Sequence, residues 1–211
     1  MRICFFIPNL ADGGAQRQCI ELMNVMQRDP LLDLHLILLG PGQHEDKLDT
    51  TRLSVHRVSV RNFASPISLL FVLRILRKTK PDVLISWLHP ADIISYAATR
   101  INRRVHWIMT ERDSSYPDAL IYNLRRRIGR SSGMIIANSR AGVEMWQAMT
   151  SDIPVELIPN IVIENQQSNT AHHSDPLFNE LLYVGRLEEQ KNVCAVASAF
   201  SSFALREETA N

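Results

Sequence analysis

The sequence predicts an α/β fold with a doubly wound parallel sheet. Short apolar runs alternate with longer segments in which apolar residues recur every three or four positions. Several of the short runs are apolar almost throughout, as in strands that are buried on both faces of a parallel sheet. A regular alternation of such strands with helices is typical of a Rossmann-like domain.

The elements follow one another from the N-terminus. The expected strands are Arg2–Ile7, Leu34–Leu39, Val55–Val60, Val83–Trp87, Val105–Met109, Met134–Ala137 and Val155–Ile158. The expected helices are Ala15–Arg28, Ile67–Lys78, Ala91–Asn102, Ala119–Arg130 and Arg140–Met149. The first helix places Cys19, Met23 and Met26 on one stripe, as an amphipathic helix should. The fourth carries an apolar stripe of Leu120, Leu124 and Ile128.

The composition changes after Pro159. Residues 1–160 form the predicted Rossmann-like domain, and the polar segment 161–177 has the composition of a linker. Residues 178–211 hold a predicted strand at Leu181–Val184 and a predicted helix at Val193–Phe203. One βα pair cannot bury its own apolar surface without neighbouring strands. We therefore expect residues 178–211 to be the incomplete start of a second α/β domain, and the chain to be a fragment.

The overall composition excludes several classes of protein. The chain of 211 residues is 45% hydrophobic and 21% charged with a net charge of +1, unlike a strongly basic nucleic-acid binder. Cys4, Cys19 and Cys194 lack paired spacing, and we interpret them as small buried hydrophobes in a reducing compartment. No His/Cys spacing indicates a metal site. No apolar run approaches the ~18 residues of a spanning helix, so we expect a cytoplasmic protein, with surface contact to a membrane left open.

Two strand-to-helix turns could bind an anion. Gly13 and Gly14 precede the first helix, where glycine allows positive φ and lets backbone N–H groups approach a ligand at the positive end of the helix. The alternative is a simple tight turn. In the second turn, Arg186 and Lys191 follow Gly185 and could grip a diphosphate. The alternative there is a pair of solvated surface cations.

Two further groups of polar residues follow predicted strands, where ligands bind in open α/β sheets. His89 follows Trp87 and could donate to a sugar hydroxyl or a phosphate, or could be a satisfied interior histidine. Glu111, Arg112 and Asp113 could hold a sugar, act as acid or base, or form an ion-pair network.

Two predicted helices carry basic faces. One holds Arg125–Arg127 and Arg130, and the other holds Arg74, Arg77 and Lys78. These faces could contact anionic lipid headgroups or could be ordinary solvated surfaces.

Taken in order, these segments resemble glycosyltransferase family 4, whose members have the two-domain GT-B fold. The resemblance rests on Gly13-Gly14-Ala15-Gln16-Arg17, Lys80-Pro81-Asp82-Val83-Leu84-Ile85-Ser86, Thr110-Glu111-Arg112-Asp113, Ala137-Asn138-Ser139, Ile158-Pro159-Asn160 and Gly185-Arg186-Leu187…Gln190-Lys191-Asn192. It implies that residues 1–160 are the acceptor-side half. The Glu111-Arg112 pair is similar to that of members that extend bacterial surface polysaccharides, lipopolysaccharide or lipid-linked oligosaccharides.

The resemblance implies a retaining transfer of a sugar from a nucleotide diphosphate sugar to a hydroxyl acceptor, without a required metal or other cofactor. It assigns Gly13, Gly14, Arg186 and Lys191 to the donor diphosphate. Arg112 and Asp113 are expected at the acceptor or sugar, with Glu111 and His89 as the catalytic candidates. Many relatives have a histidine where this chain has Glu111, so a histidine role does not carry over to this position.

The family's paired glutamates, which hold the donor sugar and ribose, have no counterpart in this sequence. The resemblance therefore implies that these 211 residues alone are inactive or nearly so. One alternative is a non-catalytic acceptor-binding or membrane-binding subunit, or a truncated remnant, that needs a partner donor domain. A nicotinamide-dependent oxidoreductase ranks last, because Gly40-Pro41-Gly42 stands where an acidic residue would follow the second strand.

Overall fold

The computed structural model describes residues 1–60, 62–63, 65–113, 116, 119–162, 182–185, 187 and 192–210. The chain divides into two compact units, residues 1–163 and 164–211. Each unit is described by itself.

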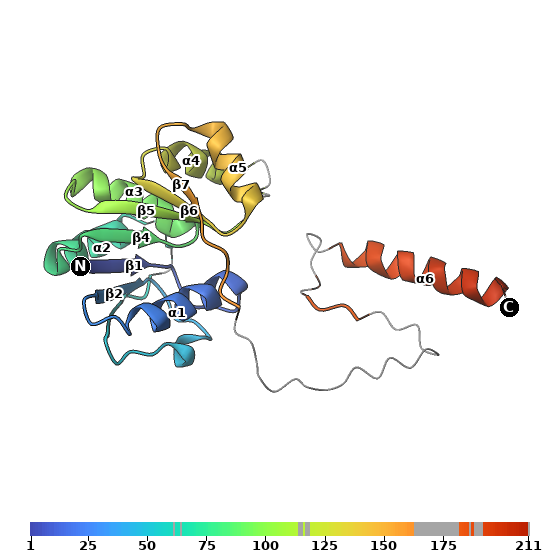
Figure 1. Cartoon of the computed structure of the whole chain (residues 1–211). Coiled ribbons are helices and arrows are strands. Elements are labelled where there is room, and N and C mark those ends of the chain that lie inside the picture. Colours follow the sequence, from blue (N-terminus) through green and yellow to red (C-terminus); the bar gives the residue numbers. More distant parts are fainter. Residues whose placement is uncertain are drawn as a thin grey trace. The chain divides into compact units, whose positions relative to one another are not determined.

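The first unit is built on a seven-stranded parallel sheet with the order β3-β2-β1-β4-β5-β6-β7 (Figure 1). The strands are β1 Arg2–Phe6, β2 Asp33–Leu38, β3 Leu53–Arg57, β4 Val83–Ser86, β5 His106–Glu111, β6 Met134–Ala137 and β7 Val155–Leu157. All seven predicted strands are present, and every neighbouring pair is parallel. The predicted bounds were wrong mainly at β3, which begins and ends earlier than Val55–Val60.

Five helices connect the strands, as predicted. They are α1 Gly14–Met26, α2 Pro66–Thr79, α3 His89–Ile101, α4 Leu120–Gly129 and α5 Arg140–Met149, with a short 3₁₀ helix η1 at Glu45–Lys47. Helix α1 packs against the side chains of Ile3 and Phe5, whereas α2 and α3 pack against Cys4 and Phe6. Successive side chains of a strand point to opposite faces, so α1 covers one face of the sheet and α2 and α3 the other.

The strand order places a topological switch point between β1 and β4. The chain leaves β1 through α1 toward β2, and it returns from β3 through α2 to β4 on the other side of β1. The two connections leave the sheet in opposite directions, which opens a crevice outside the carboxyl ends of β1 and β4. Open α/β sheets bind their ligands in such a crevice.

Helix α4 buries only the last residue of its predicted apolar stripe, Ile128. Its buried residues are Arg125, Ile128 and Gly129, whereas Leu120 and Leu124 are exposed. The interpretation of Arg125 as part of a solvated basic face was therefore wrong. The reason is an ion-pair network, described below, that holds the Arg125 guanidinium in the interior and turns the leucines outward.

The second unit contains α6 Val193–Ala210, where a helix was predicted. Residues 182–184 are not assigned to a strand, so the predicted strand at Leu181–Val184 is wrong at its described positions. The side chains of Leu182, Val184 and Leu187 are exposed, in keeping with a unit that cannot bury its own apolar surface. The predicted linker lies outside the described residues except for positions 161–162. Across the described residues of both units, no helix combines the length and apolar content that a bilayer crossing requires.

The reactivity of the three cysteines tests which of them the fold buries. Cys4 and Cys19 are buried free thiols, and burial raises the pKa of both, that of Cys19 to about 12. Cys194 is exposed, which corrects the prediction that all three are buried. We expect one thiol per chain to react rapidly with a thiol-specific reagent in native buffer, and three after denaturation. Protection of only one thiol in the native chain would contradict this arrangement.

Candidate functional site

The glycine turn lies at the carboxyl end of β1, on the edge of the switch-point crevice. Gly13 has a φ of 177°, and no glycine of the described residues has a positive φ, so the predicted left-handed turn is wrong. Glycine matters here for space instead. A Cβ added at Gly14 would meet no heavy atom within 4 Å, so the backbone at Gly14 faces open space. A ligand can therefore approach the backbone itself.

The N-terminus of α1 has no cap from a side chain and no acidic residue in its first turn. Ser65 caps α2 and Ser139 caps α5 through hydrogen bonds to backbone N–H groups, whereas α3 and α4, like α1, have no side-chain cap. The first N–H groups of a helix have no partner within the helix, and the helix dipole makes them attractive to anions. The turn at Gly13-Gly14 therefore has the donors that a phosphate needs.

Trp87 and Arg112 join three elements at this site. The indole Nε1 of Trp87, at the end of β4, donates to the backbone oxygen of Ala15 at 2.8 Å. The guanidinium of Arg112, after β5, lies over the Trp87 ring with Cζ 3.6 Å from the ring centroid. The glycine turn and the end of β5 therefore meet through a stacked tryptophan–arginine pair, an arrangement that holds an arginine in a fixed orientation.

Arg112 has hydrogen-bonding capacity that its neighbours do not use. Its Nη1 donates to Oδ1 of Asn160 at 3.4 Å, a long contact that Asn138 shares through its own Nδ2. Its Nε is buried without a hydrogen-bond partner among the described residues. Burial lowers the pKa of Arg112 to about 10, so the group stays charged at neutral pH. A buried, charged donor without a partner is costly unless a ligand supplies an acceptor.

The segment after β7 crosses the carboxyl ends of the strands to α1 (Figure 1). Its end is held by Gln18 of α1, whose amide accepts from the N–H of Ile161 at 2.6 Å and donates to the carbonyl of Ile161 at 2.8 Å. This double hydrogen bond fixes the segment that carries Asn160. The site therefore has residues that follow β1, β4, β5, β6 and β7.

Glu111 is fully buried, and both of its carboxylate oxygens are occupied. Oε1 accepts the backbone N–H groups of Arg112 and Asp113, at 3.0 and 3.1 Å, and the hydroxyl of Tyr116. Oε2 accepts from Arg125 at 2.6 Å and from Nε1 of Trp146 at 2.8 Å. Of the three alternatives that the sequence left open for Glu111, this geometry corresponds to the ion-pair network. Glu111 shapes the turn that presents Arg112 and Asp113.

The centre of that network is Arg125 of α4, whose side chain is only 3% exposed. Its Nε donates to Oδ2 of Asp92 at 2.6 Å, and its Nη1 donates to Glu111. Burial raises the pKa of Asp92, and the Arg125 charge opposes that rise. Burial acts to lower the pKa of Arg125, but the two carboxylates outweigh it and raise the pKa. One guanidinium thus neutralises part of the charge of two buried acids and links α3 and α4 to the end of β5.

His89 begins α3 beside this network. Its ring packs edge to face against Tyr122 of α4, with centroids 5.4 Å apart. Burial and, secondly, the nearby Arg125 charge lower the pKa of His89, which favours the neutral imidazole. The preceding residue, Leu88, has a φ of 73° and a ψ of 153°, a conformation that costs a non-glycine residue about 1–3 kcal/mol. The turn between Trp87 and His89 is therefore held under strain by its surroundings.

The loop after β2 packs against the residues that precede the glycine turn. A Cβ at Gly42 would lie 2.2 Å from the backbone carbon of Leu10, so only glycine fits there without displacement of that backbone. The N–H of His44 donates to the carbonyl of Leu10 at 2.9 Å, and Nε2 of His44 lies 3.1 Å from Oδ1 of Asp12. Gly42, the last residue of the Gly40-Pro41-Gly42 segment that argued against an oxidoreductase, serves to position the residues before Gly13.

The structure brings together some of the predicted site residues and not others. Gly13, Gly14 and Arg112 share the crevice, Glu111 lies buried behind it, and His89 faces α4. Arg186 and Lys191 lie outside the described residues. Sequence reasoning missed the roles of Trp87, Arg125 and Asn160. Asn138 and Asn160 were part of the quoted motifs, but nothing local showed that both would meet Arg112.

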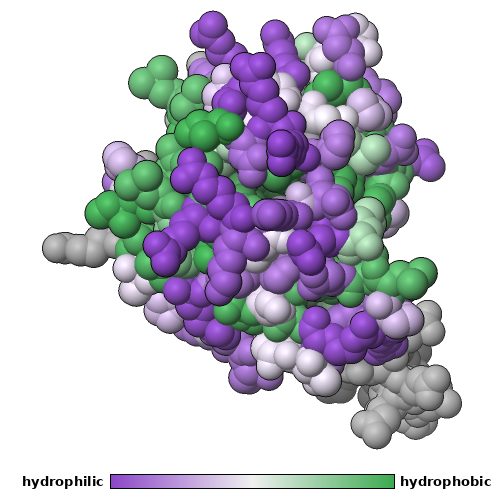
Figure 2. All heavy atoms as spheres, turned by 90° about the vertical axis from the view of Figure 1, so that its left-hand side faces the viewer, coloured by the Kyte–Doolittle hydropathy of each residue, from purple (hydrophilic) through white to green (hydrophobic). Residues whose placement is uncertain are grey.

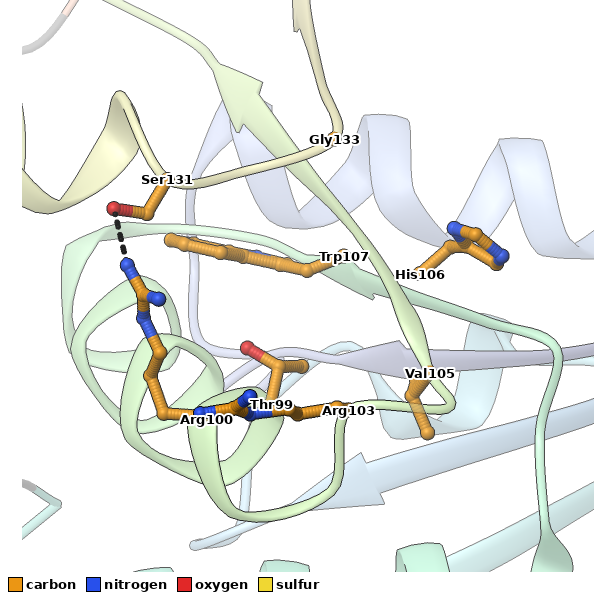
Figure 3. Close-up of a pocket in the computed structure, with 8 residues that line it drawn as sticks. All are labelled: Thr99, Arg100, Arg103, Val105, His106, Trp107, Ser131 and Gly133. Atoms are coloured by element: carbon orange, nitrogen blue, oxygen red, sulfur yellow. Dashed lines mark hydrogen bonds between the residues drawn. The ribbon is translucent and has the colours of Figure 1, made fainter.

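A separate hollow of about 350 Å³ lies at the opposite, amino ends of β5 and β6 (Figure 3). It is lined by Thr99, Arg100, Arg103, Val105, His106, Trp107, Ser131 and Gly133. Arg100 reaches Oγ of Ser131 at 3.1 Å, so part of its donor capacity is already used. None of these residues was predicted as a site residue. Elsewhere in the described part of the chain, no group of three or more His, Cys, Asp or Glu side chains could hold a metal ion.

Comparisons with known proteins agree with this architecture. The chain is 24% identical over 200 residues to a Campylobacter jejuni transferase named GalNAc-alpha-(1->4)-GalNAc-alpha-(1->3)-diNAcBac-PP-undecaprenol alpha-1,4-N-acetyl-D-galactosaminyltransferase. The match covers 91% of this chain and 54% of that protein, so the chain spans about half the length of this relative.

Solved structures share the fold of the first unit. Anabaena HepE in complex with UDP and glucose matches with a TM-score of 0.61 at 16% identity, over 76% of this chain and 44% of HepE. The lipopolysaccharide outer core galactosyltransferase WaaB matches with a TM-score of 0.55 at 14% identity, over 77% of this chain and 46% of WaaB. The family model described as Glycosyltransferase Family 4 matches residues 12–165, from the glycine turn past the end of the parallel sheet, and the chain therefore belongs to that family.

Proposed function

We propose that this chain is the acceptor-side half of a retaining glycosyltransferase. It acts in polysaccharide, lipopolysaccharide or lipid-linked oligosaccharide synthesis at the cytoplasmic face of a membrane. The donor is a nucleotide diphosphate sugar, and UDP-sugars are favoured because HepE binds UDP and glucose. The acceptor is a hydroxyl of a saccharide, for which the Campylobacter relative offers a lipid-linked precedent.

One observation carries the proposal: the buried Arg112 Nε has no hydrogen-bond partner among the described residues, and its guanidinium is stacked on Trp87 beside the start of α1, which no side chain caps. A fixed cation and a helix N-terminus without a side-chain cap then share one crevice. Together they complement an anionic group of a donor or an acceptor. The open space at Gly14 supports a close approach of that group to the backbone.

In the transfer, the acceptor oxygen forms a bond to the anomeric carbon as the bond to the diphosphate oxygen breaks. The bonding electron pair leaves with the nucleotide, and the acceptor proton passes to the departing phosphate. Backbone donors at Gly13 and Gly14 stabilise the charge that develops on the diphosphate, in concert with Arg186 and Lys191. Arg112 and Asp113 hold the sugar of the donor, whereas His89 packs against Tyr122 and contacts no part of the crevice described above. Glu111 contributes indirectly, because its carboxylate accepts the backbone N–H groups of Arg112 and Asp113 and so fixes their turn.

Titration of the ¹⁵N-labelled chain with UDP-glucose, UDP-galactose and UDP-N-acetylgalactosamine tests the proposed site. The chain has three tryptophans, and their indole N–H signals report on three places. The Trp87 indole contacts the glycine turn, whereas those of Trp107 and Trp146 bond to Ser86 and Glu111 in the interior. We expect a saturable shift of the Trp87 signal that exceeds the other two.

Two variants make this titration specific. Arg112→Met is expected to weaken binding about tenfold or more, because it removes a charge-assisted donor. Arg104→Met, at an exposed arginine, is the matched control and should bind like the wild type. Equal shifts of all three indoles, or unaltered binding by Arg112→Met, would refute the site. A transfer assay with the same sugars should detect little or no turnover by this chain alone.

The second candidate is a non-catalytic acceptor-binding subunit or remnant that works with a donor half from another chain. The exposed Leu182, Val184 and Leu187 favour it, since they offer apolar surface for a missing neighbour. The sequence of the DNA just downstream discriminates between the candidates. A reading frame that continues into the paired glutamates favours a single enzyme, whereas a separate frame for a complete donor domain favours a split pair.

A further inference from the structure

The hollow at the amino ends of β5 and β6 lies on the side of the first unit that Figure 2 shows, where hydrophilic side chains predominate. We call the space between Arg100, Arg103, His106 and Ser131 the amino-edge hollow. Its residues come from the end of α3, the start of β5 and the segment between α4 and β6 (Figure 3). Its volume of about 350 Å³ is sufficient for a small molecule, since ligand sites begin at about 300 Å³. It lies at the opposite edge of the sheet from the crevice, so the transfer reaction does not account for it.

The lining of the amino-edge hollow carries positive charge. Arg100, Arg103 and His106 contribute to it, and no acidic side chain does. Within the described residues, neither arginine forms an ion pair. The N–H of His106 donates to the backbone oxygen of Asp82, but the carboxylate of Asp82 accepts the N–H of Arg2 at 2.7 Å, on the β1 side. An anion in the hollow therefore meets two arginine charges that no neighbouring acid of the described chain neutralises.

Two contacts hold the Arg100 guanidinium in place. Its Nη2 donates to Oγ of Ser131 at 3.1 Å, and its Cζ lies 5.3 Å from the centroid of the Tyr96 ring (Figure 3 shows the first of these contacts). The hydrogen bond to Ser131 leaves other N–H donors of the guanidinium for a ligand. The Ser131 hydroxyl accepts from Arg100 and keeps its own hydrogen as a donor. The hollow therefore presents a cation that is oriented before any ligand binds, which lowers the entropic cost of binding.

These groups suit a phosphate monoester better than a carboxylate. A phosphate monoester carries about −1.5 to −2 charges near neutral pH and has three strong acceptor oxygens. Two arginines and a hydroxyl match both its charge and its acceptors, because arginine pairs well with phosphate oxygens. Val105 and Trp107 also line the hollow and add apolar surface beside the cations. A phosphate joined to a small organic body therefore complements the lining as a whole.

A chain of buried hydrogen bonds leads from the amino-edge hollow to the crevice. Nε1 of Trp107 donates to Oγ of Ser86 at 2.8 Å, and that hydroxyl donates to Oδ1 of Asp92 at 2.5 Å. The other oxygen of Asp92 accepts from Arg125, which also donates to Glu111, the residue that holds the turn after β5. All five side chains are buried. In a close-packed interior, where linked hydrogen bonds polarise one another, a shift of the first group changes the later ones.

We propose that the amino-edge hollow binds a small phosphate monoester, and that its occupancy changes the turn after β5 through the chain of hydrogen bonds from Trp107 to Glu111. The phosphate lies between Arg100 and Arg103 and accepts from Ser131, and the organic part lies against Trp107. The ligand is then an effector of the crevice, and by linkage a ligand of the crevice changes the affinity of the hollow by the same factor. This inference goes beyond the proposed transfer reaction, and its test contains no nucleotide sugar.

Titration of the ¹⁵N-labelled 211-residue chain with ribose 5-phosphate, in a buffer without phosphate, tests the amino-edge hollow. The Trp107 indole signal and the Gly133 amide signal should shift in a saturable way, and binding should weaken as salt is raised. The Trp146 indole, which donates to Glu111 at the far end of the chain of hydrogen bonds, should shift less but with the same midpoint. The Trp87 signal should shift less than that of Trp107. Neutral ribose and the carboxylate gluconate should produce no saturable shift.

A pair of double variants tests the charges. Arg100→Met/Arg103→Met is expected to weaken binding of ribose 5-phosphate about tenfold or more, because it removes both cations of the hollow. Arg28→Met/Arg74→Met removes the same charge from exposed positions outside the hollow and should bind like the wild type.

Two further variants break the chain of hydrogen bonds. Trp107→Phe keeps an aromatic ring but lacks the indole N–H, and Ser86→Ala removes the next link, so that one of them suffices if the other does not fold. In either variant the Gly133 amide should still report binding, whereas the Trp146 response should be lost.

The outcomes separate binding from coupling. Absence of a Trp107 shift, equal shifts with ribose or gluconate, a largest shift at Trp87, or equal affinities of the two double variants would overturn the binding site. A Trp146 signal that stays fixed in the wild type, or that responds fully in Trp107→Phe and Ser86→Ala, would overturn the coupling.

Discussion

Replacing Arg125 by methionine is expected to destabilise the first unit by about 3–5 kcal/mol, which could prevent folding of a domain of ordinary stability. The variant leaves Asp92 and Glu111 buried without their shared cation, and both carboxylate side chains are 0% exposed. Methionine has a similar length and helix propensity, so the loss reports on the charge and its hydrogen bonds. Urea denaturation followed by circular dichroism measures it. Arg127→Met, at an exposed position of the same helix, should change stability by less than about 0.5 kcal/mol.

The pH dependence of this loss separates electrostatics from packing. The pKa of Asp92 is already raised by burial, and removing Arg125 raises it further. A carboxyl group whose pKa is raised in the folded state stabilises that state at low pH, and this stability is lost as pH rises through the folded pKa. The deficit of Arg125→Met should therefore be smaller at pH 5 than at pH 8. An equal deficit at both values would point to a packing defect instead.

Gly42→Ala is expected to combine a loss of stability of about 1–3 kcal/mol with displacement of the glycine turn. The new Cβ would lie 2.2 Å from the backbone carbon of Leu10, and backbone cannot rotate away as a side chain can. Leu10 leads directly into Asp12 and Gly13, so the displacement reaches the proposed phosphate donors. The measurements are urea denaturation and the titration with UDP-sugars, in which the Trp87 signal should shift less or not at all.

Gly14→Ala is the matched substitution. Its Cβ would meet nothing within 4 Å, and alanine favours a helix over glycine, so the variant should be at least as stable as the wild type. If a ligand approaches the backbone at Gly14, this methyl group obstructs it and binding weakens although the fold is intact. Normal binding by Gly14→Ala would show that the ligand does not use this backbone, and normal stability of Gly42→Ala would contradict the packing at Leu10.

Much of the fold could be predicted because it depends on local patterns. Burial alone explains the apolar runs of β1 and β6, at Arg2–Phe6 and Met134–Ala137. It also explains the stripe of Cys19 and Met23 on α1. The candidate site was predicted only in part. Gly14 and Arg112 follow predicted strands, and residues that follow the strands of a parallel sheet are candidates for ligand binding. The stacking of Arg112 on Trp87 and its contact with Asn160 join residues far apart in sequence, and no local pattern records such pairs.

The sequence by itself determined the parallel α/β sheet, since the period of apolar residues and the order of strands and helices suffice for it. The location of the crevice depends on the strand order within the sheet, which only the folded chain shows. The tertiary structure alone decided which face of α4 is buried. The apolar periodicity predicted that Leu120 and Leu124 are buried. Instead, the ion pairs of Arg125 with Asp92 and Glu111 place Arg125 in the interior and leave both leucines exposed. A buried charge costs far more than an exposed leucine. The position of α4 therefore depends on partners from α3 and β5, which only the folded chain brings together.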